Sequence, residues 1–162
     1  MAGMPEPEFI DTLSRNIAAV PHVSGINNHR GSLLTQQSGN MAWLMQALHD
    51  YGELFFIDSR TTAETVAADM AQSYGVPSAS RNVFLDNEPT PQAIRKQFRE
   101  LVARARADGT ALAIGHPHPA TLAVLAEELP RLAEQGLQLV PVSQLIEHQK
   151  ERRLAWQGSS SH

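Results

Sequence analysis

The sequence of 162 residues contains no cysteine. This excludes disulfides, a thiolate nucleophile and a cysteine-ligated metal, and it is compatible with either the cytoplasm or the periplasm. No apolar run approaches the roughly 20 residues of a membrane-spanning helix. Residues 1–8 lack the charged and apolar regions of a signal peptide.

Positive charge is also limited. The 13 Lys and Arg residues against 17 Asp and Glu give a net charge of −4, and no basic stripe is evident, so nucleic acid is not expected as a partner. The chain carries no glycine-rich phosphate loop, no dinucleotide fingerprint and no Gly-x-Ser-x-Gly elbow. Its length is sufficient for one domain with a sizeable core.

Helical and strand patterns alternate along the chain. Apolar spacing predicts helices at residues 6–20, 40–51, 61–74, 91–108, 119–135 and 143–155. Short apolar runs predict strands at residues 23–27, 54–57, 82–85, 111–114 and 137–140. Thr61 or Thr62 and Ser143 are expected to cap helices, and Pro130 to kink one. This alternation predicts an α/β fold with a mainly parallel sheet.

Polar clusters follow four of the predicted strands. They are Asn27-Asn28-His29, Asp58-Ser59-Arg60-Thr61, Asp86-Asn87-Glu88 and Gly115-His116-Pro117-His118. The steps from His29 to Asp58, then to Asp86, then to His116 are 29, 28 and 30 residues, about one strand, one helix and two turns. Because parallel strands present their carboxyl ends on one edge, the clusters are predicted to converge on one pocket.

The residue types in these clusters limit the chemistry. Histidine and aspartate ligands could hold a zinc ion with an open position, which lowers the pKa of its bound water to about 7. A further histidine could act as a general acid or base. Metal-free acid–base hydrolysis is less favoured, and a serine nucleophile at Ser32 or Ser59 lacks its usual elbow.

Structural roles compete with these functional ones. Asn27 and Asn28 could close a turn, because asparagine tolerates left-handed backbone angles. Asp58 could cap the next helix with Arg60 as its ion-pair partner, a role that is compatible with catalysis. His29 follows two asparagines directly, which favours a functional role.

Structural and functional roles also compete in the last two polar clusters. Asp86 is more typical of a turn or cap before Pro89, and His118, between two prolines, is expected on the surface. His116 comes after an apolar strand and is predicted to be functional.

Five motifs occur in a characteristic order, at residues 24–32, 54–62, 81–87, 113–117 and 139–143. Together they resemble the divergent polysaccharide deacetylase family of bacteria, from about residue 5 to residue 147. The resemblance implies a distorted (β/α) barrel of the carbohydrate deacetylase superfamily with its early strands missing. The barrel part would span residues 5–150, followed by a polar tail at 151–162.

The resemblance also implies a function. Relatives remove acetyl groups from polysaccharides with a divalent metal, usually zinc: a metal-activated water attacks the acetyl carbonyl, an aspartate acts as base and a late histidine as acid. The expected partner is a polysaccharide or a peptidoglycan-type glycan, and the expected location is the periplasm or cell envelope.

Site residues are carried over by motif. The resemblance implies that His29 is a metal ligand and His116 the late catalytic acid. Asp58 would lie beside the metal or orient a catalytic group, with Arg60 holding it and also available to substrate. Asn27 and Asn28 would contact substrate, and Asn28 could also position His29.

Two departures from the family pattern affect the prediction. Arg30 stands where the family usually has Met, and the family's early Asp-Asp pair and further histidine are absent from this sequence. Zinc catalysis uses three protein ligands, so little deacetylase activity is expected from this chain alone. The alternative is a noncatalytic envelope or carbohydrate-binding protein. An open edge on the parallel sheet also predicts that the chain associates, with homo-oligomers as one expected form.

Overall fold

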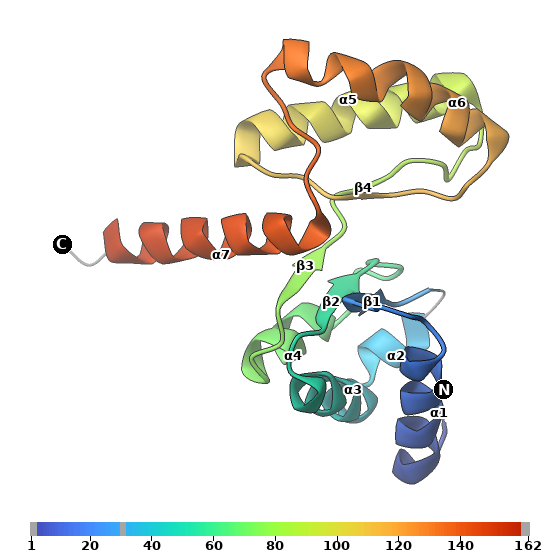
Figure 1. Ribbon diagram of the computed structural model, residues 1–162, viewed down its shortest axis with the longest axis vertical. Helices are drawn as coiled ribbons and strands as arrows, with labels where there is room; N and C mark the ends of the chain where they lie inside the picture. The colour runs from blue at the N-terminus through green and yellow to red at the C-terminus, as the bar shows by residue number, and fades with distance from the viewer. Residues whose placement is uncertain (1–2, 30–31, 160–162) are drawn as a thin grey trace. The chain divides into compact units, whose positions relative to one another are not determined.

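The computed structural model describes residues 3–29 and 32–159 and divides into two compact units, Met1–Ser80 and Arg81–His162 (Figure 1). Both units combine helices with parallel strands, so the predicted α/β class and parallel pairing are confirmed. Within the described part of the chain, no helix is both long and apolar enough to cross a membrane.

The first unit contains a three-stranded parallel sheet. Its strands, in spatial order, are β1 (Gly25–Asn27), β2 (Phe55–Asp58) and β3 (Ser78–Ser80). The helices are α1 (Glu6–Ala18), α2 (Ser32–Gln36), α3 (Ser38–Tyr51) and α4 (Ala67–Ser73). Consecutive strand order with right-handed crossovers carries α3 and α4 to the same face of the sheet.

The core of the first unit forms between the helices and that face. Phe9 of α1, Met41 and Met45 of α3 and Phe56 of β2 are at most 1% exposed. Their burial follows the predicted apolar spacing of α1 and α3. This core fixes β2, and with it the polar residues that follow the strand.

The second unit pairs β4 (Val83–Phe84) with β5 (Ala113–Ile114) in parallel. Its helices are α5 (Pro91–Asp108), α6 (Pro119–Glu128) and α7 (Val142–Ser159), with 3₁₀ turns η1 (Leu129–Arg131) and η2 (Ala133–Gln135). Helices α5 and α6 lie side by side (Figure 1). Helix α5 matches its predicted range and begins where the Thr90 hydroxyl caps the Ala93 amide at 3.3 Å.

Two helix predictions need correction. The helix expected at 61–74 begins only at Ala67, so neither Thr61 nor Thr62 caps it. The Thr62 hydroxyl instead hydrogen-bonds Glu64 within the loop after β2. The helix expected at 119–135 ends at Glu128 and continues as 3₁₀ turns, because Pro130 has no amide hydrogen to continue the α-helical ladder.

Three further predictions differ from the structure. The strand expected at 137–140 is not formed, and the Leu137 amide instead closes a turn onto the Leu132 carbonyl at 3.0 Å. Strand β3 was not predicted because its small residues give no apolar run. Helix α7 already begins at Val142, so Ser143 lies inside it and is not its cap. The distorted barrel with missing early strands stays a prediction.

Candidate functional site

Strand register decides which of the polar clusters meet. In β1 and β2, Asn27 pairs with Ile57, so Asn28 reaches the residues that follow β2. In β4 and β5, Phe84 pairs with Ile114, and continuing this register by two residues sets Asp86 opposite His116. Within each unit, the structure therefore brings two of the predicted polar clusters together.

Asn28 is the centre of the first cluster. It is 7% exposed, its Oδ1 accepts a hydrogen bond from the Ser59 amide at 2.7 Å, and its carbonyl accepts one from the Ser59 hydroxyl. The Asn27 Nδ2 donates to the Ser59 hydroxyl at 3.4 Å. Within the described residues, the Asn28 Nδ2 has no hydrogen-bond partner. A buried donor without an acceptor is costly, so this amide is suited to an acceptor atom on a ligand.

Asp58 ends β2 and is 1% exposed. One carboxylate oxygen accepts from the Arg60 amide at 2.8 Å, and the other accepts from the Thr65 hydroxyl at 3.0 Å. Arg60 has a φ of 47°, a left-handed conformation that is uncommon outside glycine. The predicted role of Asp58 as a helix cap is therefore wrong. The carboxylate holds a strained turn and accepts a hydrogen bond from the backbone amide of Arg60.

His29 follows Asn28 and is exposed. In the described parts of the chain, the one group of three potential metal ligands does not include it. Its predicted role as a metal ligand stays a prediction.

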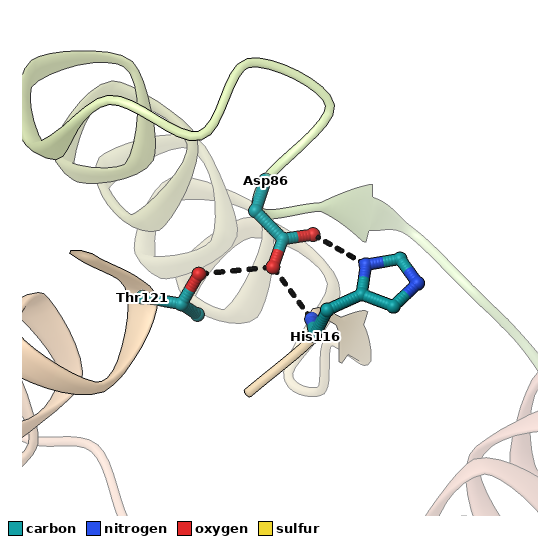
Figure 2. A network of polar contacts seen from close by, with 3 residues as sticks. All are labelled: Asp86, His116 and Thr121. Carbon is teal, nitrogen blue, oxygen red and sulfur yellow. Dashed lines mark hydrogen bonds and ion pairs between the residues drawn. The ribbon is translucent and has the colours of Figure 1, made fainter. Parts of the chain in front are cut away.

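The second cluster is built on Asp86, the second residue after β4 (Figure 2). One carboxylate oxygen accepts from the His116 amide at 2.5 Å and from the Thr121 hydroxyl at 2.9 Å. The other lies 3.1 Å from the His116 Nδ1. The Asp86 side chain is completely buried and that of His116 is 39% exposed. A buried carboxylate thus orients an imidazole that remains accessible.

The protonation of Asp86 follows from these contacts. Burial alone would raise the pKa of the carboxyl, but hydrogen bonds from the His116 amide, the His116 ring and the Thr121 hydroxyl favour the ionised form. Together with attraction to the His116 ring, they hold the pKa of Asp86 below its usual 3.8. At neutral pH, Asp86 is an anion facing Nδ1 of His116.

Packing around this pair restricts its movement. The rings of Phe84 and His118 lie 5.6 Å and 5.5 Å from the His116 ring between centroids. A Cβ atom on Gly115 would meet the Leu85 Cβ at 3.3 Å and an Asp86 carboxylate oxygen at 3.4 Å, so glycine permits the close approach of β5. An apolar cavity of about 700 Å³ reaches His116 and Thr121 from the side of α5 and α6.

The metal expected from the resemblance can be tested against these donors. Ligand atoms of Asp86, His116 and His118 lie within 4.8 Å of one another. Both Asp86 oxygens already face hydrogen-bond donors, which suits a carboxylate that orients a histidine better than one that binds metal directly. Two histidines then remain, and catalytic zinc takes three protein ligands. The described residues therefore do not complete a zinc site, which would need a further protein ligand.

His116 is identified from the sequence, whereas its partners Asp86 and Thr121 carry weaker sequence signals. Asp86 looked like a turn residue before Pro89, and Thr121 lies inside a helix, where threonine gives no special signal. A signal for Asp86 was present, because its spacing of 30 residues from His116 equals the register offset of β4 and β5. Asp86 and His116 each stand two residues beyond one of the two paired strands, and this equal position could have indicated the pair.

The sequence and the fold of this chain are similar to those of known proteins. A family model described as divergent polysaccharide deacetylase matches residues 1–146. The chain belongs to this family. The sequence-based assignment is confirmed.

Two curated relatives are similar to this chain. An uncharacterized protein of Haemophilus influenzae is 38% identical over 148 residues, which cover 91% of this chain and 52% of that protein. The uncharacterized protein YibQ of Escherichia coli is 43% identical over 127 residues, covering 78% of this chain and 39% of YibQ. The chain thus spans about half the length of these relatives or less.

A solved structure is also similar. The crystal structure of the uncharacterized protein ATU2773 from Agrobacterium tumefaciens matches with a TM-score of 0.84 and 25% identity. The match covers 89% of this chain and 58% of that protein. It supports the mixed α/β fold.

Proposed function

We propose that this chain supplies the acid side of a polysaccharide deacetylase, a hydrolase that removes acetyl groups from a glycan. The observation that carries the proposal is the Asp86–His116 pair, a buried carboxylate facing the Nδ1 of a half-exposed imidazole. Such an orienting contact favours the tautomer with the proton on Nδ1 and directs Nε2 away from the carboxylate. Membership of the deacetylase family supplies the reaction class.

In the proposed reaction, His116 in its protonated form donates the Nε2 proton to the sugar nitrogen or oxygen as the bond to the acetyl carbon breaks. Asp86 acts as a positioning residue that stabilises the charged imidazolium during this transfer. Thr121 and the His116 amide hold Asp86 in place. A bound divalent metal, with zinc as the expected ion, would supply the activated water.

Substrate contacts are assigned to the first cluster. The Asn28 Nδ2, buried and without an acceptor among the described residues, would donate to a carbonyl or hydroxyl oxygen of the glycan. Asn27 precedes Asn28 in the chain and Arg60 follows Ser59, the partner of Asn28, and both are proposed to contact the same ligand. His29 is proposed as a metal ligand. Asp58 is proposed to orient a catalytic group and not to bind the metal itself, because both of its carboxylate oxygens already accept hydrogen bonds.

The activity is proposed to need more than these residues. The described residues leave the zinc site incomplete, and the curated relatives are about twice as long as the matched region or longer. The substrate is proposed to be an envelope glycan, which would place the protein in the periplasm or cell envelope. The same polar residues would also serve a noncatalytic carbohydrate-binding protein, and the two functions differ in acetate release.

The test measures acetate released from acetylated chitin oligosaccharides and peptidoglycan. The 162-residue chain is compared with a version extended by the in-frame upstream codons, each with zinc and with chelator. We expect release near background from the 162-residue chain, chelator-sensitive release from the extended version, and loss of release in its His116→Ala variant. No release from either version, or full activity of His116→Ala, would overturn the proposal. Strong zinc-dependent release of acetate by the 162-residue chain would overturn only the claim that the activity needs further residues.

A further inference from the structure

The second unit carries a hollow of about 600 Å³ between β4 and α5. Its lining includes four cationic residues, Arg81, Lys96, Arg99 and Arg104, and the carboxylate of Glu100. The chain as a whole has a net charge of −4, so this concentration of positive charge runs against the average composition. We name it the cationic hollow.

Helix α5 directs its cations to two sides. Arg95 forms an ion pair with Glu127 of α6 at 2.5 Å, away from the hollow. Arg104 faces the hollow but is paired with Glu100 at 2.8 Å. Lys96 and Arg99 are exposed in the hollow, and neither has a carboxylate partner among the described residues. Uncompensated cations on one wall of a concave site raise the local concentration of anionic ligands.

Phe84 joins the cationic hollow to the Asp86–His116 pair. The guanidinium carbon of Arg81 lies 5.0 Å from the centre of the Phe84 ring, within cation–π range. The centre of the His116 ring lies 5.6 Å from the same ring. The side chain of Phe84 is half-buried and lines the hollow. A ligand held by the hollow would therefore lie next to the proposed catalytic acid.

We propose that the cationic hollow binds a carboxylate or phosphate group carried by the glycan whose acetyl group is presented to His116. The inference rests on the proposed function and assigns it a substrate class, an anionic rather than a neutral polysaccharide. Guanidinium groups bind both anions through paired hydrogen bonds, and the Lys96 ammonium adds a point charge. The polar side chains of Asn82 and Asn87 in the lining would contact sugar hydroxyls.

The test is calorimetric binding with the 162-residue chain, so it does not depend on acetate release. The probes are a neutral N-acetylglucosamine oligomer, an oligomer of equal length containing N-acetylmuramic acid, and a phosphorylated oligomer. We expect at least one charged oligomer to bind about tenfold tighter than the neutral one, with an advantage that declines as salt rises. Comparison of the carboxylated and phosphorylated probes distinguishes the two sources of the anion.

Matched variants locate the effect. The Lys96→Glu/Arg99→Glu double variant should lose the preference for charged glycan. The Lys150→Glu/Arg153→Glu variant on α7 makes the same change in net charge at exposed positions and should keep it. His116→Ala should also keep it, which separates this inference from the fate of the deacetylase proposal.

Several results would overturn the inference. Equal binding of neutral and charged oligomers, or no binding of any, would exclude an anion subsite. Equal losses in both double variants would indicate a general charge effect. Binding of duplex DNA as tight as that of the charged glycans, and equally sensitive to Lys96 and Arg99, would identify an unselective cationic surface.

Discussion

Asp58 and Asp86 are two buried aspartates that lie at or just beyond the carboxyl ends of parallel strands, yet they have different partners. Asp58 is bound by Arg60 and Thr65, residues two and seven positions away. Asp86 is bound by His116 and Thr121, residues 30 and 35 positions away. The first closes a local turn, whereas the second joins two strands and a helix and faces a titratable ring. Burial of an acid is therefore no guide to its role until its partners are known.

The largest expected difference between the two aspartates is in stability. Asp86→Ala leaves the His116 amide and the Thr121 hydroxyl without their acceptor in a buried site, and should lower the free energy of unfolding by about 2–4 kcal/mol. Asp58→Ala, whose lost contacts lie within one loop, should cost about 1–2 kcal/mol. Urea denaturation of both variants measures the difference. A larger cost at Asp58 would contradict the comparison.

The pH dependence of stability should also depend on Asp86. Its pKa is lowered on folding, so the ionised carboxylate stabilises the folded state above the usual value of 3.8. That stabilisation is lost as the pH falls from 3.8 through the lowered pKa. Asp86→Asn should therefore be less stable than the parent at neutral pH, and the two should converge in acid. A constant difference between the two unfolding curves at all pH values would show that ionisation of Asp86 is not involved.

Thr121 and Thr65, which bind Asp86 and Asp58, allow a comparison with a smaller expected effect on stability. Thr121→Val keeps the side-chain shape but removes the hydroxyl that binds Asp86, at an expected cost of about 1 kcal/mol. Because Asp86 would be held less firmly, the NMR signals of the His116 ring should shift as well. Thr65→Val removes the equivalent bond to Asp58 and should leave those signals unchanged. Shifts of equal size in both variants would count against a specific Asp86 network.

Substitution of Gly115 should have an effect on stability no larger than that of Thr121→Val. Gly115→Ala introduces a Cβ at 3.3–3.4 Å from Leu85 and Asp86, and should destabilise the second unit by about 1 kcal/mol. Gly39→Ala in α3 meets no atom within 4 Å and should stabilise by about 0.5–1 kcal/mol, because alanine favours the helix. Thermal unfolding distinguishes the two signs. Stabilisation by Gly115→Ala would show that β5 has room to move.

The sequence predicted the elements whose signals are local. Helix α5 shows apolar spacing, a proline in its first turn and a following glycine, and was found residue for residue. Strand β3 was missed because Ser78, Ala79 and Ser80 gain their place from pairing with β2, which is a tertiary effect. The loop after β2 was read as helix because threonines resemble caps, although Asp58 and Thr65 hold it open.

The residues of the site, like the helices and strands, were predictable where their sequence signals are local. His116 was identified because it follows the end of an apolar strand, where polar residues of α/β sites gather. Asp86 depends on a partner 30 residues away, and only the register of β4 and β5 makes that distance meaningful. Thr121 has no sequence signal, because its role arises from the packing of α6 against the end of β4.

Asp86 is expected to set the tautomer of His116. Nitrogen-15 NMR of histidine-labelled protein measures this directly, at a pH where the ring is neutral. We expect His116 to carry its proton on Nδ1 in the parent protein, and we expect this preference to weaken in Asp86→Asn while His22 is unaffected. A proton on Nε2 in the parent, or an unchanged tautomer in Asp86→Asn, would contradict it.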